Sequence, residues 1–391
     1  MTDSPAARYV VLGLQLGRHV DGIAESYVGP AELAEAVDAG PLVEPSELVD
    51  RADILLAELR DGWLRDQVRG LRAYAGVLAG EGPSYADEVE RCYGVRPRRT
   101  DESVFAAAHG ELDRLLPGTG PVAERHRAWE ESIRVPADAI ERAATAVIEE
   151  ARRQTRALVE LPEGEDIAVE MVHDEPWLAF CEYLGDLQSR ISVNGDLPIS
   201  AIELLALAIH ETYPGHHTER CCKEQALVRR LGLLEETLVL VPTPQSMVAE
   251  GIATVAPWLL LEGNGAAALA DVVRREADVD FDLDLALAVG RALEPCRWAN
   301  LNAALMLHEA GAKESDVQAY LERWGLLAPD MATHLIRFLQ EPTSRTYIIT
   351  YLAGHELTRA YVGADAARFR RLLTEQVRVG ELLADGDITP P

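Results

Sequence analysis

Apolar residues recur at helical spacing along most of this 391-residue chain, and the pattern changes only once, between residues 161 and 198. Good helix formers, chiefly Ala, Leu, Glu and Arg, fill the periodic stretches. The sequence therefore predicts a mainly α fold with a multi-helical body. We expect helices over residues 47–80 (two helices), 103–116, 136–159, 219–232, 246–262, 265–290, 297–311, 315–324, 329–340, 346–362 and 366–383.

The exceptional segment has the pattern of a small sheet. IAVEMV (167–172) alternates in polarity, and ISV (191–193) is followed by Asn-Gly, a pair that favours a tight hairpin turn. Ser200 and Glu203 then form a capping box ahead of an apolar helix. We expect a small antiparallel sheet beside that helix. LPEGED (161–166) is the one plausible lobe boundary, which divides a helical lobe (1–165) from a catalytic lobe (166–391), packed as one continuous unit.

Charge and composition exclude several classes of partner. The net charge is -28, so binding to nucleic acid or to an anionic membrane is disfavoured, because both need a basic face. The five cysteines have no spacing typical of a disulfide framework, which favours free thiols in a reducing compartment. The first residues lack the basic region and cleavage site of a signal peptide. We therefore expect a cytoplasmic protein.

The most informative motif is HETYPGHH at residues 210–217. His210 and Glu211 match the start of the zinc-peptidase pattern His-Glu-x-x-His, but residue 214 is proline. In an unbroken helix His216 would lie about 240° around the axis from His210, and His217 about 10.5 Å further along it. Neither can share a metal with His210 in that geometry, since two zinc ligands lie about 3–3.5 Å apart.

Pro214 makes an unbroken helix improbable, because proline removes a backbone donor and collides with the preceding turn. A widened turn that loops out Pro214 and Gly215 would place His216 where the second histidine normally lies. His217 is then left as a substrate contact or as the alternative ligand.

A third ligand and a base can be assigned nearby. Glu250 is a carboxylate in an otherwise apolar stretch, where it must be paired, metal-bound or exposed. We predict one zinc per chain, held by His210, by His216 or His217, and by Glu250. Glu211 would project about 100° away from His210, which suits a general base acting on a water of lowered pKa.

HETYPGHH and the later VAEGIA (248–253) resemble the large bacterial family called domain of unknown function 885, whose members are regarded as mainly helical zinc metallopeptidases of the glutamate type. VDGIAESYVGPAEL (20–33) and RTYIITYLAG (345–354) extend the resemblance over most of the chain. The resemblance implies His210 and His216 as ligands, in preference to His217, with Glu211 as base and Glu250 as third ligand. It also implies that the strand near Ser192–Asn194 binds an extended substrate by strand addition.

Further candidates follow from the same resemblance. Tyr351 matches a family tyrosine suited to donate to an oxyanion, and Tyr347, one turn away, competes with it. His308 matches a family histidine, although Ala304 stands where the family has Asp. Apart from the resemblance, Arg345 is a candidate anchor for a substrate carboxylate. We expect Asn194 and His217 to contact substrate. His355 and Glu356 repeat the His-Glu pair, but Arg359 fills the place of a second histidine, so we interpret them as structural.

Three functions remain open from the sequence. The first is a zinc-dependent hydrolase that cleaves a peptide or related amide bond in a small-molecule or short-peptide substrate. The second is a non-haem Fe(II) enzyme, since two histidines and one carboxylate also form its metal site. The third is a non-catalytic peptide-binding protein that retains the fold.

Overall fold

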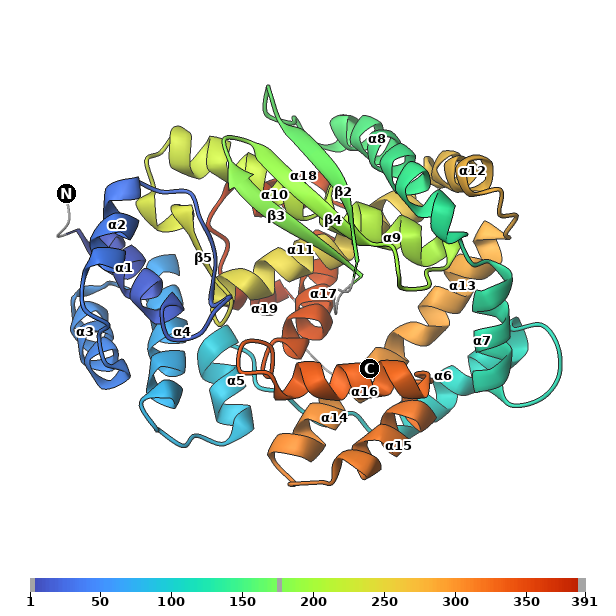
Figure 1. The fold of residues 1–391 in the computed structure, drawn as a ribbon, viewed down its shortest axis with the longest axis horizontal. Helices are drawn as coiled ribbons and strands as arrows, with labels where there is room; N and C mark the ends of the chain where they lie inside the picture. The colour runs from blue at the N-terminus through green and yellow to red at the C-terminus, as the bar shows by residue number, and fades with distance from the viewer. Residues whose placement is uncertain (1–3, 174–177, 386–391) are drawn as a thin grey trace.

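The structure is a computed structural model that describes residues 4–173 and 178–385. Helices dominate it and the strands are few and short, so the prediction of a mainly α fold is confirmed (Figure 1). The first part of the chain forms α1 (Pro5–Gly17), β1 (Ala24–Tyr27), α2 (Ala31–Ala39), α3 (Pro45–Glu58), α4 (Trp63–Leu78), α5 (Tyr85–Tyr93), α6 (Glu102–Leu115), α7 (Val122–Ser132), the 3₁₀ turn η1 (Ala137–Ala139) and α8 (Ile140–Leu158).

Strands and the remaining helices follow. They are β2 (Asp166–Val172), β3 (Ala179–Gly185), β4 (Gln188–Asn194), α9 (Ala201–Glu211), α10 (His216–Lys223), the π-helix η2 (Glu224–Arg229), η3 (Leu234–Thr237), β5 (Leu238–Leu240), α11 (Pro244–Leu261), α12 (Ala266–Ala277), α13 (Leu283–Leu293), η4 (Glu294–Arg297), α14 (Trp298–His308), α15 (Glu314–Trp324), α16 (Pro329–Gln340), α17 (Ile348–Val362), α18 (Ala366–Thr374) and α19 (Val379–Asp385).

Two predicted helices prove to be pairs. The helix expected over 265–290 is broken between α12 and α13, where Asp278 adopts a left-handed conformation and Asp282 caps the next helix through the backbone N–H of Leu285. The helix expected over 366–383 is likewise divided into α18 and α19. Among the described residues no single helix is long and apolar enough to cross a membrane; α11 and α12 pass that test only together, with an 89° bend between them.

The predicted sheet exists, and one of its two pairings is antiparallel as expected, but the other is parallel. Its strand order is β2-β4-β3, with β4 antiparallel to β3 and parallel to β2. The hairpin between β3 and β4 turns at Asp186 and Leu187, whose φ angles of 52° and 64° are those that a type I′ turn requires. Asn194 instead ends β4. One face of the sheet packs on α9 and α10, and α8 lies against β2.

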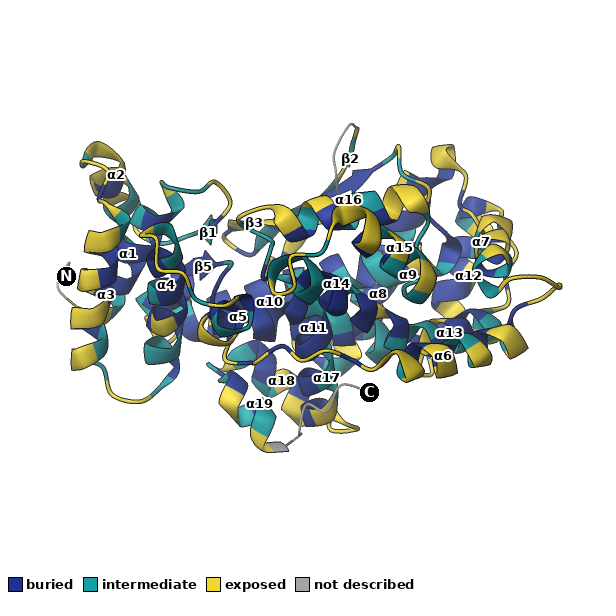
Figure 2. Ribbon diagram, turned by 90° about the horizontal axis from the view of Figure 1, so that it is seen from below, coloured by how far each residue is buried: buried dark blue, intermediate teal, exposed yellow. Residues whose placement is uncertain are grey.

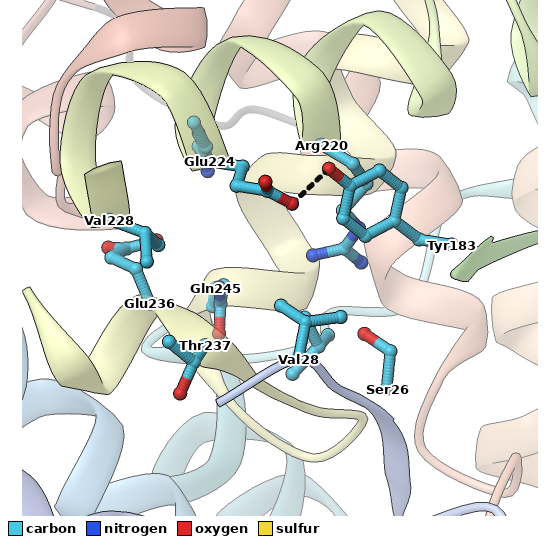
Figure 3. A pocket seen from close by; sticks show the side chains of 11 residues that line it. Ser26, Val28, Tyr183, Arg220, Glu224, Val228, Glu236, Thr237 and Gln245 are labelled. Carbon is cyan, nitrogen blue, oxygen red and sulfur yellow. Dashed lines mark hydrogen bonds between the residues drawn. The ribbon is translucent and has the colours of Figure 1, made fainter. Parts of the chain in front are cut away.

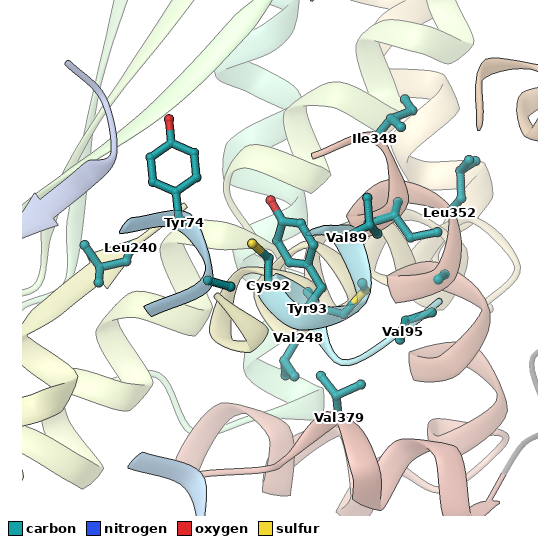
Figure 4. Close-up of a cluster of buried hydrophobic side chains, with 14 of the residues drawn as sticks. Tyr74, Val89, Cys92, Tyr93, Val95, Leu240, Val248, Ile348, Leu352 and Val379 are labelled. Atoms are coloured by element: carbon teal, nitrogen blue, oxygen red, sulfur yellow. The ribbon is translucent and has the colours of Figure 1, made fainter. Parts of the chain in front are cut away.

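Both hydrophobic cores draw on residues from either side of position 165. One core includes Tyr93 of α5, Val248 of α11 and Leu352 of α17 (Figure 4). In the other, Ile148 of α8 packs with Leu205 of α9. Figure 2 shows the buried residues gathered along α10 and α11 at the centre of the molecule. The two expected lobes thus share their interior.

A second, two-stranded sheet pairs β1 with β5 in antiparallel register, with Tyr27 opposite Leu238. It ties the N-terminal helices to the centre of the chain. This pairing places the half-buried Glu25 next to α10.

The closest helix contact joins α11 and α17. A Cβ added to Gly251 would lie 2.6 Å from the carbonyl oxygen of Gly354, and one added to Gly354 would lie 2.7 Å from the carbonyl oxygen of Met247. The two backbones can approach only because neither position carries a side chain.

We expect Gly251→Ala or Gly354→Ala to lower the free energy of unfolding by about 1–3 kcal/mol, since the added carbon must push the helices apart. Gly290→Ala is the matched control, because Gly290 is a helical glycine whose added Cβ would meet no atom within 4 Å. That control should be neutral or stabilising by about 0.5–1 kcal/mol. Urea unfolding measures all three, and equal effects at the three positions would contradict the close contact.

Candidate metal centre

The segment HETYPGHH joins two helices. Ser200 and Glu203 form the predicted capping box at the start of α9, and the helix ends at Glu211. Residues 212–215 leave the helix, the Tyr213–Pro214 peptide is cis, and α10 begins at His216. The widened turn in one helix is therefore wrong, because Pro214 ends the first helix and a second one starts. A Cβ on Gly215 would collide with the carbonyl oxygen of His210.

This break turns His216 toward His210. Their ring centroids lie 4.8 Å apart, with the rings edge to face. Glu250 of α11 completes a cluster: its Oε2 lies 3.5 Å from Nε2 of His210, and its Oε1 lies 3.6 Å from Nε2 of His216. The three donor atoms all lie within 4.8 Å of one another.

The cluster fits a zinc ion. Bonds of about 2.0–2.2 Å in tetrahedral geometry separate two ligand atoms by about 3.3–3.6 Å, and each histidine nitrogen lies at such a distance from one of the two Glu250 oxygens. Oε2 of Glu250 is also buried without a hydrogen-bond partner. A buried carboxylate oxygen with no donor is costly unless a cation is bound to it.

The pKa values of His210, His216 and Glu250 depend on one another. Burial, together with the nearby His216, lowers the pKa of His210 to about 4, so this ring is neutral. Burial alone would lower the pKa of His216, but the Glu250 carboxylate outweighs it and raises that pKa to about 9. Burial opposes ionisation of Glu250, yet both histidines overcome it and its pKa is lowered. Without metal, the site therefore holds one proton on His216.

Glu211 stands beside the cluster as expected for a base. Its Oε1 lies 4.0 Å from Nε2 of His210. Burial, assisted by the negative charges of Glu250 and Glu25, raises its pKa to about 7, although His216 opposes the shift. A carboxylate with a pKa near neutrality is suited to accept and return a proton.

The two candidate tyrosines have different surroundings. The Tyr347 hydroxyl donates to Oε1 of Glu250 at 2.7 Å. The Tyr351 ring packs edge to face on Tyr347 at 5.4 Å, and its hydroxyl has no hydrogen-bond partner in the described part of the chain. Burial, then the charges of Glu250 and Glu211, raise the pKa of Tyr351 well above its usual value. Tyr347 therefore orients the Glu250 carboxylate, whereas the Tyr351 hydroxyl is free among the residues that the structure describes.

His217 points away from the cluster and is fully buried. Its Nδ1 lies 2.7 Å from Oγ of Ser189, and its Nε2 lies 3.2 Å from Oε2 of Glu165. Glu165 also accepts hydrogen bonds from Tyr213 and from Arg152. Glu165 thus holds both residues that flank Pro214–His216. The expected role of His217 as ligand or substrate contact has no support in this geometry.

Three other candidates lie apart from the cluster. Nε2 of His308 lies 2.7 Å from the carbonyl oxygen of Leu339, and its ring stacks on Tyr85. Arg345 donates to the buried Glu88 at 2.8 Å. Asn194 ends β4, the middle strand, whose two edges are already paired, so strand addition at Ser192–Asn194 is excluded.

Two charged residues that sequence reasoning missed also border the cluster. Arg220 lies one turn after His216 on α10 and is buried, and its Nη2 donates to Oε1 of Glu25 at 3.1 Å. Glu25 comes from β1, 195 residues earlier. Spacing in the sequence gives no signal for such a pair; the resemblance of the segment 20–33 was the only hint.

A second His-Glu group lies along α17. Nε2 of His355 lies 2.7 Å from Oε1 of Glu294, with Glu356 close by. Arg359 donates to both oxygens of Glu294 at 3.2 Å. Because Arg359 already supplies the positive charge, the group has the character of an ion-pair network, in keeping with the structural interpretation of this pair.

The raised pKa of His216 predicts pH-dependent zinc uptake. Below about pH 9 the ring is protonated, so zinc must displace that proton, and apparent affinity should rise about tenfold per pH unit toward pH 9. Calorimetry at pH 7 in two buffers of different ionisation enthalpy should show one proton released. The same measurement on Glu211→Gln removes any protons released by Glu211. Zinc uptake without proton release would contradict the protonated state of His216.

Variants of the two neighbouring histidines should differ in their zinc content. We expect His216→Ala to lose zinc, because a ligand is removed. His217→Ala should keep one zinc per chain with affinity reduced about 10- to 100-fold, since Glu165 loses a partner that positions the break. Metal analysis after dialysis measures both, and the opposite order would make His217 the ligand.

No family model matches this chain, and no curated protein matches it. Two solved structures are similar. One, from Shewanella oneidensis and provisionally described as a lipoprotein of unknown function, has 14% identity and a TM-score of 0.52, with 97% of this chain and 72% of that one covered. The other, from Colwellia psychrerythraea and provisionally described as a lipoprotein, has 15% identity and a TM-score of 0.50 over 90% of this chain and 64% of that one. At this identity the likeness shows the fold alone, and the chain spans less than two thirds of the Colwellia protein.

Proposed function

We propose that the protein is a zinc-dependent hydrolase that cleaves a peptide or related amide bond in a short substrate in the cytoplasm. The observation that carries the proposal is the convergence of His210, His216 and Glu250 at ligand distances, with a buried Glu250 oxygen left without a donor. The resemblance of HETYPGHH and VAEGIA to the family named above supports the same conclusion.

A bound zinc would supply Lewis-acid chemistry and a water of lowered pKa. The residues of the chain divide the remaining work. Glu211, with a pKa near 7, accepts the proton of the attacking water and returns it to the leaving amine. Tyr351 donates its free hydroxyl to the developing oxyanion. Tyr347 holds Glu250 in the orientation that its ligand role requires.

Glu211 also favours hydrolysis over the non-haem iron alternative. Both chemistries use two histidines and one carboxylate. Of the two, only hydrolysis needs a general base beside the cluster, and Glu211, with a pKa near 7, is suited to that role. Metal analysis of protein purified without added metal or chelator separates them: about one zinc per chain supports the hydrolase, and iron supports the alternative. Bound zinc without cleavage of any peptide or amide pool would favour the third function, a non-catalytic peptide-binding protein.

Glu211→Gln should keep its zinc and lower kcat/KM for a peptide substrate by about 10²–10⁴-fold, because the amide cannot accept the proton. A peptide-library assay beside metal analysis tests this. Full activity in Glu211→Gln would remove the base from the mechanism.

The tyrosines provide a matched pair. Tyr351→Phe should lower kcat by about 10- to 10³-fold at unchanged zinc content, since only the oxyanion donor is lost. Tyr347→Phe should instead weaken zinc binding by about 10- to 100-fold, since Glu250 loses its hydrogen bond. Titration with a chelator separates the two effects, and a reversed pattern would exchange the roles.

A further inference from the structure

A small pocket lies next to Arg220, on the side where β1 meets η3 and β5 (Figure 3). Side chains from β3, α10, η2 and the start of α11 complete its walls. The pocket has room for about one or two groups of the size of a water molecule. None of its lining residues belongs to the His210–His216–Glu250 cluster.

Two buried acceptors in this pocket have no donor. Oε2 of Glu236 and Oε1 of Gln245 form no hydrogen bond, although their residues are only 8% and 2% exposed. The other oxygen of Glu236 accepts from Nε2 of Gln376 at 2.9 Å. Leaving such acceptors unmet is costly, so the pocket suits a group that brings N–H donors.

Charge favours a cationic donor. The two cations of the pocket each have a carboxylate: Nζ of Lys223 lies 2.7 Å from Glu219, and Arg220 is bonded to Glu25. Glu224 is paired with Arg229. Glu236 alone of these carboxylates has no cation within ion-pair distance among the residues that the structure describes. The pocket therefore contains one carboxylate without an ion-pair partner. Burial raises the pKa of Glu236, and a bound cation would oppose that shift, as the charge of Lys223 already does.

The pocket and the metal cluster draw residues from the same two helices. Arg220 follows His216 by four residues on α10, about 6 Å along the axis, and Gln245 precedes Glu250 by five residues on α11, about 7.5 Å. Arg220 thus shares α10 with His216, and Gln245 shares α11 with Glu250. An extended lysine side chain spans about 6 Å from Cα to Nζ. That length is about the separation of His216 and Arg220 along α10.

We propose that this pocket binds a primary ammonium group of the substrate, carried by a lysine side chain next to the scissile bond or by a free amino terminus at that distance. That the bound ammonium belongs to a substrate rests on the proposed hydrolase function. The ammonium would donate to Oε2 of Glu236 and Oε1 of Gln245. The net charge of -28 would favour the approach of such cationic peptides.

Amine binding can be tested without hydrolysis. The probe is n-butylamine, which carries the four-carbon chain and ammonium of lysine, with n-butanol as the neutral control. We expect the amine alone to raise the Tm of the wild-type protein, and Glu236→Gln to weaken its binding about 10- to 100-fold. Gln245→Met, which removes the second acceptor without changing the charge, should weaken it too. Glu235→Gln is the matched control, because Glu235 does not line the pocket.

His216→Ala should keep amine binding, so this test stands apart from the metal site. No stabilisation by the amine, or equal stabilisation of wild type and Glu236→Gln, would overturn the proposal and leave a pocket that holds internal water only. Glu236→Asp keeps the charge and, if folded, should retain part of the binding, which guards against misfolding of the Gln variant.

The source of the ammonium is tested with four peptides, containing lysine or norleucine next to the cleaved bond and a free or acetylated amino terminus. A kcat/KM preference for lysine that Glu236→Gln abolishes supports the side chain. A preference for the free terminus, abolished in the same way, supports the terminus. Equal rates for all four would overturn the link to substrate. Absence of any cleavage, with amine binding intact, would instead reject the proposed hydrolase.

Discussion

The backbone contact between α11 and α17 is the constraint on which the centre of this molecule depends. Glu250 directly precedes Gly251, and Tyr347 and Tyr351 lie within two turns of Gly354. The spacing of the two helices therefore decides whether the Tyr347 hydroxyl reaches the Glu250 carboxylate. A glycine at each contact point is thus as much a part of the candidate site as the residues that carry its chemistry.

The three histidines of one short segment show how surroundings assign roles to identical side chains. His217 has a protein partner at each ring nitrogen and is fully buried, so its hydrogen bonds are already made. His210 and His216 both face Glu250, and their pKa values are shifted in opposite directions. Glu165 fixes this division, because it holds Tyr213 and His217 on either side of the break.

Local sequence rules predicted the parts of the structure that depend on neighbouring residues. The capping box at Ser200 and most helices follow from such rules, and Glu250 was found because a carboxylate in an apolar stretch needs a partner. The choice between His216 and His217 was open from spacing alone, since it depends on how the chain leaves α9. The hairpin turn was misplaced because Asn-Gly is the usual signal, whereas here Leu187 adopts a positive φ.

Features made by distant segments were beyond such reasoning. The parallel pairing of β2 with β4 skips the strand between them in sequence, and no local pattern records it. Glu25 and Arg220 meet only because β1 pairs with β5. A single sequence shows which residues stand at positions 25 and 220, but not that their side chains are in contact.

The pairing of β1 with β5 also bears on how the chain is made. The centre of the molecule takes Glu25 from near the start of the chain and Tyr347 from near its end, and one core joins Tyr93 to Leu352. During synthesis the apolar helix α11 must therefore emerge before the helix that covers it exists. Until α17 has been made, the apolar face of α11 that α17 covers stays exposed, and chaperones act on exposed surface of that kind.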